Sequence, residues 1–272
     1  MARLKEYNGH YCESEYEYAF IGFLEAEGWK HSSGNNISRV TKRDVLIADD
    51  FKKFIADTNL DLTEDEVIQI YDNVRLVGAE SDFATLHKVY GWMGNGVQFT
   101  PQDGLPRMIP LIEFDNWDKN IFRVVNQFTV EYTNNGQKEN RRPDVLLFVN
   151  GIPLCVIELK NPADANATIY DAWEQINIRY WRDIPHLLHY CPLACISDGV
   201  KTRLGTVRTP YEHFYAWRRV NEGDVVSTLP FAETETMIKG VYTPERFVEI
   251  FRDYIYLSLI HISEPTRHLR IS

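Results

Sequence analysis

Apolar side chains recur at helical spacing in several segments of the chain. In residues 14–27, Tyr16, Phe20 and Leu24 fall on one face before Gly28 ends the run, which predicts an amphipathic helix. Thr63 followed by Glu66 fits a capping box. Further helices are predicted over 49–57, 64–75, 171–184 and from Thr243 onward, and the last of these is expected to bury Phe247, Ile250, Phe251 and Tyr254.

From residue 111 the pattern changes to short runs of Val, Ile, Leu and Phe. These runs predict strands over 111–114, 122–132, 144–149, 154–159 and 193–197. Asn-Gly pairs at 135–136 and 150–151 predict tight turns between strands. Strands interrupted by a helix indicate an α/β fold with a mixed central β-sheet flanked by helices.

The predicted helix over 171–184 has two distinct faces. Its apolar face carries Trp173, Ile176, Tyr180 and Ile184. A polar stripe beside that face carries Gln175, Arg179 and Arg182. By contrast, the glycine- and proline-rich stretch 91–106 predicts a loop, and the spacing of its glycines does not make a phosphate cradle.

Composition and charge narrow the class of protein. With 272 residues, 44% hydrophobic and 25% charged, the chain has the apolar content of a folded domain and not of a disordered one. Its net charge of −10 gives no protein-wide field that attracts nucleic acid, so we expect weak DNA binding by the chain alone. The sequence has few cysteines and no signal peptide, which predicts a cytoplasmic protein. Its apolar runs are far shorter than the ~20 residues of a membrane span, so no membrane segment is predicted.

The segment from Arg141 to Lys160 carries the candidate chemistry. Asp144 precedes one predicted strand, and Glu158 and Lys160 lie at the end of the next, two residues apart and hence on one face. Converging carboxylates can hold Mg²⁺, and a neighbouring ammonium can orient a water and stabilise developing negative charge. This pattern favours phosphodiester hydrolysis; the alternative is a set of solvated charges at strand ends.

Strand parity sets a condition on that chemistry. In a regular two-residue hairpin through Asn150-Gly151, Asp144 would face Ile157, and Glu158 would point to the other side of the sheet. A shared metal therefore requires one extra residue, either in the turn or in a bulge. Pro153, which cannot donate a ladder hydrogen bond, is a plausible place for it.

The segment that begins at Arg141 reads RRPDVLLFVNGIPLCVIELKNP, with FRVVNQFTV before it and AWEQI, DIP, ISDG and HFYAWRR after it. Together these runs resemble the N-terminal nuclease domain of the restriction subunit of type I restriction-modification enzymes. The resemblance extends over about 13–220, and more weakly to Tyr256. It implies a PD-(D/E)xK restriction-endonuclease-like fold in which Asp144 and Glu158 bind Mg²⁺, the Leu159 carbonyl adds a ligand and Lys160 is catalytic. It also matches Glu17 to the acidic position of the family's first helix.

The resemblance implies partners and a domain organisation. The substrate would be duplex DNA, with methylation and specificity supplied by other subunits and ATP used by a motor whose Gly-x4-Gly-Lys-Ser/Thr motif this sequence lacks. The expected parts are a nuclease domain over 1–220 with an insert at about 31–110, a helical linker over 221–257, and a foreign or disordered tail over 258–272. The alternative is a non-catalytic DNA-binding or docking module that keeps the fold.

One helix departs from the family pattern. The family carries a Gln followed four residues later by Tyr, whereas here Gln175 is followed by Arg179 at that spacing and by Tyr180 one residue further on. Gln175 is expected to take a catalytic role, and Tyr180 is interpreted as a core aromatic. Candidate DNA-backbone contacts are Arg142, Arg179 and Arg182, with further basic clusters at Arg141–Arg142, Lys201–Arg203 with Arg208, and Arg218–Arg219.

A zinc site is the remaining alternative. His186, His189, Cys191 and Cys195 lie close together in the sequence, but their spacing matches no standard zinc motif. They are therefore predicted to be packing residues.

Overall fold

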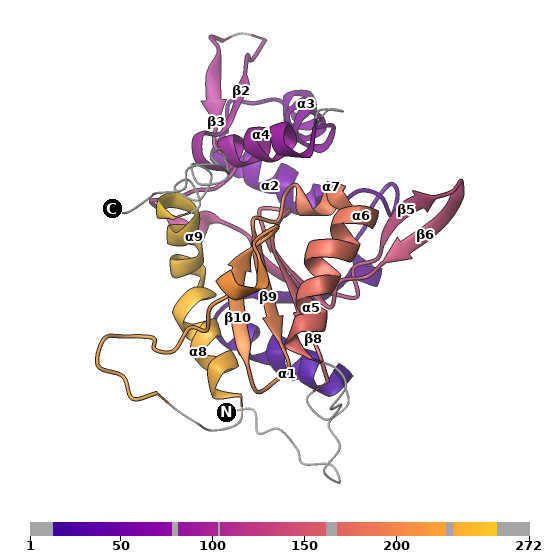
Figure 1. Cartoon of the computed structure of the whole chain (residues 1–272). Helices are drawn as coiled ribbons and strands as arrows, with labels where there is room; N and C mark the ends of the chain where they lie inside the picture. Colours follow the sequence, from indigo (N-terminus) through magenta and orange to yellow (C-terminus); the bar gives the residue numbers. More distant parts are fainter. Residues whose placement is uncertain (1–12, 78–80, 103, 162–167, 227–230, 255–272) are drawn as a thin grey trace, which may run out of the picture.

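A mixed six-stranded sheet forms the centre of the computed structural model, which describes residues 13–77, 81–102, 104–161, 168–226 and 231–254 (Figure 1). The strand order is β1 (Lys30–Ser33), β4 (Phe122–Asn126), β7 (Val145–Val149), β8 (Ile152–Leu159), β9 (Leu193–Ser197) and β10 (Thr202–Thr206). The pairs β1–β4 and β8–β9 are parallel, and the other neighbours are antiparallel. The predicted α/β fold with a mixed sheet is confirmed.

Two small two-stranded sheets accompany the central one. They are formed by β2 (Val97–Phe99) with β3 (Arg107–Ile109) and by β5 (Val130–Asn134) with β6 (Gln137–Arg141). In Figure 1 the first lies beside α3 and α4 at one end of the molecule, and the second projects from the side of the sheet.

Helices cover both faces of the central sheet. The α-helices are α1 (Glu13–Ala26), α2 (Ala48–Thr58), α3 (Glu64–Arg75), α4 (Asp82–Asn95), α5 (Ile169–Glu174), α6 (Trp181–Asp183), α7 (Pro185–Leu188), α8 (Ala232–Val241) and α9 (Pro244–Asp253). Short 3₁₀ turns are η1 (Gly34–Asn36), η2 (Trp117–Lys119) and η4 (Tyr211–His213), and η3 (Gln175–Tyr180) is a π-helix between α5 and α6. No helix in these described ranges is long and apolar enough to cross a membrane.

The two faces of the sheet have different neighbours. Tyr16 of α1 forms a 2.6 Å hydrogen bond with Ser197 of β9, which places α1 on the face of Ser197 and of its ladder partner Leu159. Glu158 is one residue before Leu159 and therefore points to the opposite face, where η3 lies. Every residue of β7 and β8 is buried, so the core is centred on this hairpin.

The predicted helices are present with ends close to those expected, including α1, α2, α3 and α9. Thr63 and Glu66 form the predicted capping box of α3, with both reciprocal bonds made. One detail is wrong: Tyr254, predicted to lie on the inner face of the last helix, is 67% exposed because α9 ends at Asp253.

The loop predicted over 91–106 is also wrong in part. Helix α4 continues through Gly91 and Gly94 to Asn95, and the chain then forms β2. Gly96 ends the helix at φ 82°, where its amide donates to the Trp92 carbonyl and a Cβ would lie 2.5 Å from the Ile109 carbonyl oxygen. This glycine is thus a helix cap, which the glycine-rich pattern alone does not distinguish from a loop.

Two predicted strands need correction. The run 122–132 is two strands, β4 and β5, because Gln127 adopts a positive φ of 57° and turns the chain between them. The run 111–114 is not a strand. The Leu111 carbonyl instead accepts a 2.9 Å hydrogen bond from the side chain of Asn150, which satisfies it without a ladder partner.

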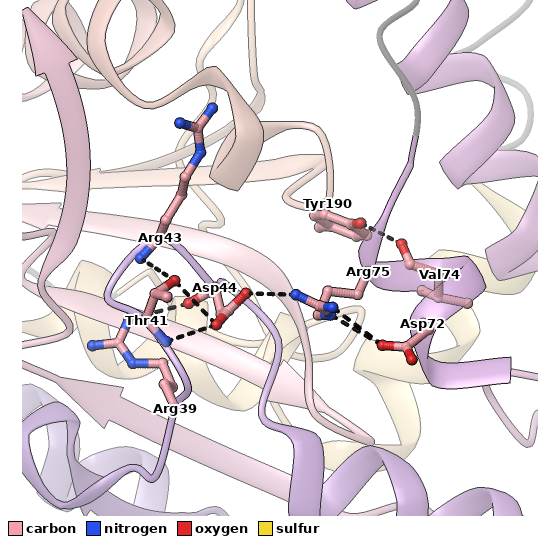
Figure 2. Close-up of polar contacts among 8 residues, drawn as sticks. All are labelled: Arg39, Thr41, Arg43, Asp44, Asp72, Val74, Arg75 and Tyr190. Atoms are coloured by element: carbon pink, nitrogen blue, oxygen red, sulfur yellow. Dashed lines mark hydrogen bonds and ion pairs between the residues drawn. The ribbon is translucent and has the colours of Figure 1, made fainter. Parts of the chain in front are cut away.

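A polar cluster connects α3 to the segment before α2 and to the connection that leads into β9 (Figure 2). Arg75 donates 3.2 Å bonds to Asp44 and Asp72, and Asp44 in turn accepts from the Thr41 amide at 2.9 Å. The buried Tyr190 hydroxyl donates to the Val74 carbonyl at 2.6 Å. The Tyr190–Val74 bond joins the segment predicted as an insert to the connection that leads into β9, whereas the other contacts lie within that segment.

Candidate active site at the end of the central hairpin

The hairpin of β7 and β8 contains the extra residue that strand parity required. Asn150 and Gly151 form a two-residue turn with φ values of 51° and 76°. Val149 then pairs with Ile152 and Phe148 with Pro153, but Leu147 pairs with Cys155, so the ladder skips Leu154. The register prediction is confirmed, with the bulge directly after Pro153.

The bulge brings the two acidic side chains to the same position on the ladder. Because Val145 pairs with Ile157, Asp144 lies opposite Glu158 at the end of the hairpin. A carboxylate oxygen of Asp144 accepts a 2.7 Å hydrogen bond from the Leu159 amide. The Asp144 and Glu158 carboxyl groups are close enough to interact electrostatically.

Gln175 connects this acidic pair to the lysine. Its amide nitrogen donates to Glu158 at 2.7 Å, and its amide oxygen accepts from the ammonium of Lys160 at 2.8 Å. One amide therefore fixes both charged groups on one face of β8. The amide orientation follows from the charges, since the ammonium can only donate.

Tyr180 is a member of the same cluster, which the interpretation as a core aromatic missed. It is only 1% exposed, and its hydroxyl donates to Glu158 at 2.6 Å and accepts from Gln175 at 2.9 Å. Helix η3 explains the unusual spacing in the sequence. A π-helix bonds residue i to i+5, so Gln175 and Tyr180, five apart, lie on the same side of the helix.

The environment of Glu158 is unfavourable for a negative charge. The residue is fully buried, and burial together with the neighbouring Asp144 raises the pKa of its carboxyl well above the ordinary value. The hydrogen bond from Tyr180 and the charge of Lys160 act in the opposite direction. A cation placed between the two carboxylates would stabilise the ionised form of both.

Glu17 lies on the other face of the sheet. It is 6% exposed and accepts hydrogen bonds from Asn126 at 2.7 Å and from Gln127 at 3.2 and 3.3 Å. Asn126 is at the end of β4 next to β7, and its ladder partner is Val145. The partners of the Glu17 carboxylate are therefore two side-chain amides. Within the described ranges, no group of three or more His, Cys, Asp or Glu side chains is arranged to hold a metal.

The candidate DNA contacts differ in how they are held. Arg142 and Arg179 are exposed. Arg182 is also exposed but forms a 2.7 Å ion pair with Asp183, which is shared by Arg141 at the same distance. The polar stripe predicted on this helix is divided, because Gln175 points inward to Glu158 while the two arginines face solvent.

The residues of the zinc alternative are dispersed. Cys191 and Cys195 are fully buried, and burial raises the pKa of both thiols, to about 12 for Cys195. His189 forms a 2.9 Å contact with Asp82, and His186 and His189 line one cavity that neither cysteine lines. The cysteines are packing residues, as predicted.

The fold and the polar cluster define an α/β domain whose central hairpin brings two carboxylates, a lysine, a glutamine and a tyrosine together at one edge of a mixed sheet. The chain belongs to the family described as type I restriction enzyme R protein N terminus, which matches residues 11–213 and so includes all the residues of the cluster. The predicted family resemblance is confirmed.

Two relatives illustrate the similarity. The putative type I restriction enzyme MjaIXP endonuclease subunit of Methanocaldococcus jannaschii is 30% identical over 264 residues, which cover 88% of this chain and 25% of that protein. The type I restriction enzyme HindI endonuclease subunit of Haemophilus influenzae is 28% identical over 258 residues, covering 89% of this chain and 24% of that protein. The chain thus spans about a quarter of the length of these relatives.

Proposed function

We propose that this chain is the Mg²⁺-dependent endonuclease domain of a type I restriction enzyme R subunit, with a PD-(D/E)xK fold, and that it hydrolyses phosphodiester bonds of duplex DNA. The observation that carries the proposal is the bulged hairpin. It sets Asp144 opposite Glu158 and leaves Lys160 on the face of Glu158, with Gln175 bonded to both of the latter.

The donor set fits Mg²⁺. Asp144, Glu158 and the Leu159 carbonyl would hold it, and oxygen is the ligand type that this hard cation requires. The pKa of the buried Glu158 carboxyl is raised even with the charge of Lys160 nearby, so a bound cation would further stabilise its ionised form. When bound, Mg²⁺ would supply Lewis-acid chemistry that withdraws charge from the scissile phosphate.

Protein side chains would position the attacking water, stabilise the developing charge and orient the metal-binding carboxylate. Lys160, fixed by Gln175, orients a water near the phosphate and stabilises the negative charge that develops during hydrolysis. Tyr180 and Gln175 hold the Glu158 carboxylate in one orientation. Glu17, which the resemblance matches to the acidic position of the family's first helix, is held by its pair of amides on the other face of the sheet.

The names of the relatives, which are endonuclease subunits of type I restriction enzymes, support an assembly of several subunits. We infer that the chain works in a cytoplasmic complex with methylation and specificity subunits and that ATP is used by motor domains outside the 272 residues. Arg142, Arg179 and Arg182 would contact the DNA backbone. The competing function is a docking module that keeps the fold without turnover.

Plasmid nicking by the assembled enzyme distinguishes these functions. Lys160→Ala is expected to abolish Mg²⁺-dependent cleavage while leaving the far-ultraviolet circular dichroism spectrum unchanged, since the lysine lies at a strand end. Lys53→Ala, on the exposed surface of α2, is the matched control and should cleave normally. Cleavage at the wild-type rate by Lys160→Ala would refute the mechanism and favour the docking module.

A further inference from the structure

A groove lies on the outside of the helix that carries Gln175 and Tyr180. It has a volume of about 410 Å³ and is formed between this helix and the segment at Arg208–Glu212. Its aromatic lining consists of Tyr170, Trp173, Trp181 and Tyr211. None of these side chains takes part in the cluster around Glu158, so the groove is separate from the candidate active site.

The rings of the groove form an ordered platform. Tyr170 stacks on Trp173 with ring centroids 5.3 Å apart and an angle of 28° between the planes. Tyr211 packs edge-on against Tyr170 at 5.1 Å and against Trp173 at 6.3 Å. Tyr170 is nevertheless 44% exposed, so its outer surface is available to a further flat ring.

Two arginines lie over these aromatic rings. The guanidinium of Arg208 is 4.6 Å from the ring centroid of Trp181, and that of Arg203 is 5.5 Å from the ring of Tyr211. Asp82, 4.0 Å from Arg208, and Glu212 are the acidic neighbours. A flat aromatic surface with guanidinium groups beside it is the combination that binds a base together with its phosphate.

The backbone of Arg208 is held in an uncommon conformation. Its φ is 71°, in the left-handed region that favours glycine, and its amide donates a 2.6 Å hydrogen bond to the side chain of Asn177. Asn177 is on the same outer face of the helix as Trp173 and Trp181, at intervals of four residues. Strain of this kind is retained where the surroundings fix a side chain in a required place.

We propose that this groove binds an unpaired nucleotide of a DNA strand, with the base on Tyr170 and the phosphate at Arg208. The proposal extends the proposed function, because the groove and the Glu158 cluster occupy opposite faces of one helix and would hold a strand next to the cut. The positive charge at Arg203 and Arg208 favours a nucleic acid over a proline-rich peptide, which is the other ligand class that aromatic grooves bind.

Fluorescence anisotropy of a labelled short oligothymidylate, titrated with the full chain in EDTA to prevent cleavage, tests the proposal. Tyr170→Ala removes the platform, and Arg208→Gly removes the guanidinium while fitting the positive φ. Each is expected to weaken binding by about 5- to 150-fold, the range for loss of one base-stacking contact. Ile178→Ala, 50% exposed on the same helix and outside the groove, is the matched control and should bind like the wild type.

The outcomes separate the groove from the nuclease. Equal oligothymidylate affinity of the wild type, Tyr170→Ala and Arg208→Gly would overturn the proposal, as would binding of a labelled proline-rich peptide with no binding of DNA. Lys53→Ala, on the exposed surface of α2, should bind the oligonucleotide as the wild type does. If the assembled enzyme does not cleave but the groove variants lose binding, the proposed catalysis fails and the groove assignment stands.

Discussion

Replacement of Tyr180 by Phe tests whether the π-helix serves the acidic pair. The substitution removes one hydroxyl, which donates to Glu158 at 2.6 Å and accepts from Gln175 at 2.9 Å, and leaves the buried ring in place. A hydrogen bond to a charged group contributes about 1.5–3 kcal/mol, which corresponds to roughly 10- to 150-fold in an equilibrium constant. Loss of a group that orients a metal ligand typically costs about 10- to 100-fold in metal affinity or activity.

The two magnitudes agree, so Tyr180→Phe should raise the Mg²⁺ concentration for half-maximal cleavage by about 10- to 100-fold. The assay is the rate of plasmid nicking by the assembled enzyme as a function of Mg²⁺. Tyr190→Phe is a matched control, because it also removes a buried hydroxyl, one that donates to the Val74 carbonyl and has no bond to Glu158 or Gln175. An unchanged Mg²⁺ dependence in Tyr180→Phe, or an equal shift in both variants, would refute the role assigned to Tyr180.

Two further predictions concern the π-helix η3 and the partly buried His186. Deletion of Ile178 should convert η3 to an α-helix, place Gln175 and Tyr180 four residues apart and preserve cleavage. Insertion of an alanine at the same point should abolish cleavage. Equal loss of cleavage in both variants would contradict this account. Burial, followed by Arg43 and His189, lowers the pKa of His186 to about 4, so the unfolded chain takes up this proton more readily. Stability should therefore fall by up to about 3 kcal/mol as the pH decreases from 6.5 to 4, and urea titrations of His186→Gln should lose this part of the slope.

The irregular register of the β7–β8 hairpin could be predicted from the sequence. Strand parity and the chemistry of a shared cation together required an irregularity between Asp144 and Glu158, and Pro153 marked its place. The ladder skips Leu154, the next residue. The position could be predicted because side chains alternate between the two faces of a strand, so a register shift of one residue moves a side chain to the opposite face of the sheet.

The predictions that were wrong concern segments whose local structure is decided by a distant part of the chain. The apolar run from Leu111 to Phe114 reads as a strand, but Asn150 takes the carbonyl that a ladder would use. Gly96 caps a helix because the Ile109 carbonyl lies where a Cβ would be. Neither contact can be read from local pattern, since each joins residues that are separated in the sequence by more than ten positions.

Tyr180 is the case in which a correct local rule gives the wrong answer. At about 100° per residue, two side chains five apart on an α-helix differ in direction by about 140°, so a helical wheel separates Gln175 from Tyr180. The π-helix removes that difference, and both side chains then bond to Glu158. A π-turn is less favourable than the α-helix it replaces, and the three hydrogen bonds among Glu158, Gln175 and Tyr180 offset that cost. The departure from the family spacing is therefore compensated by the backbone, and the side chains keep the arrangement that the site requires.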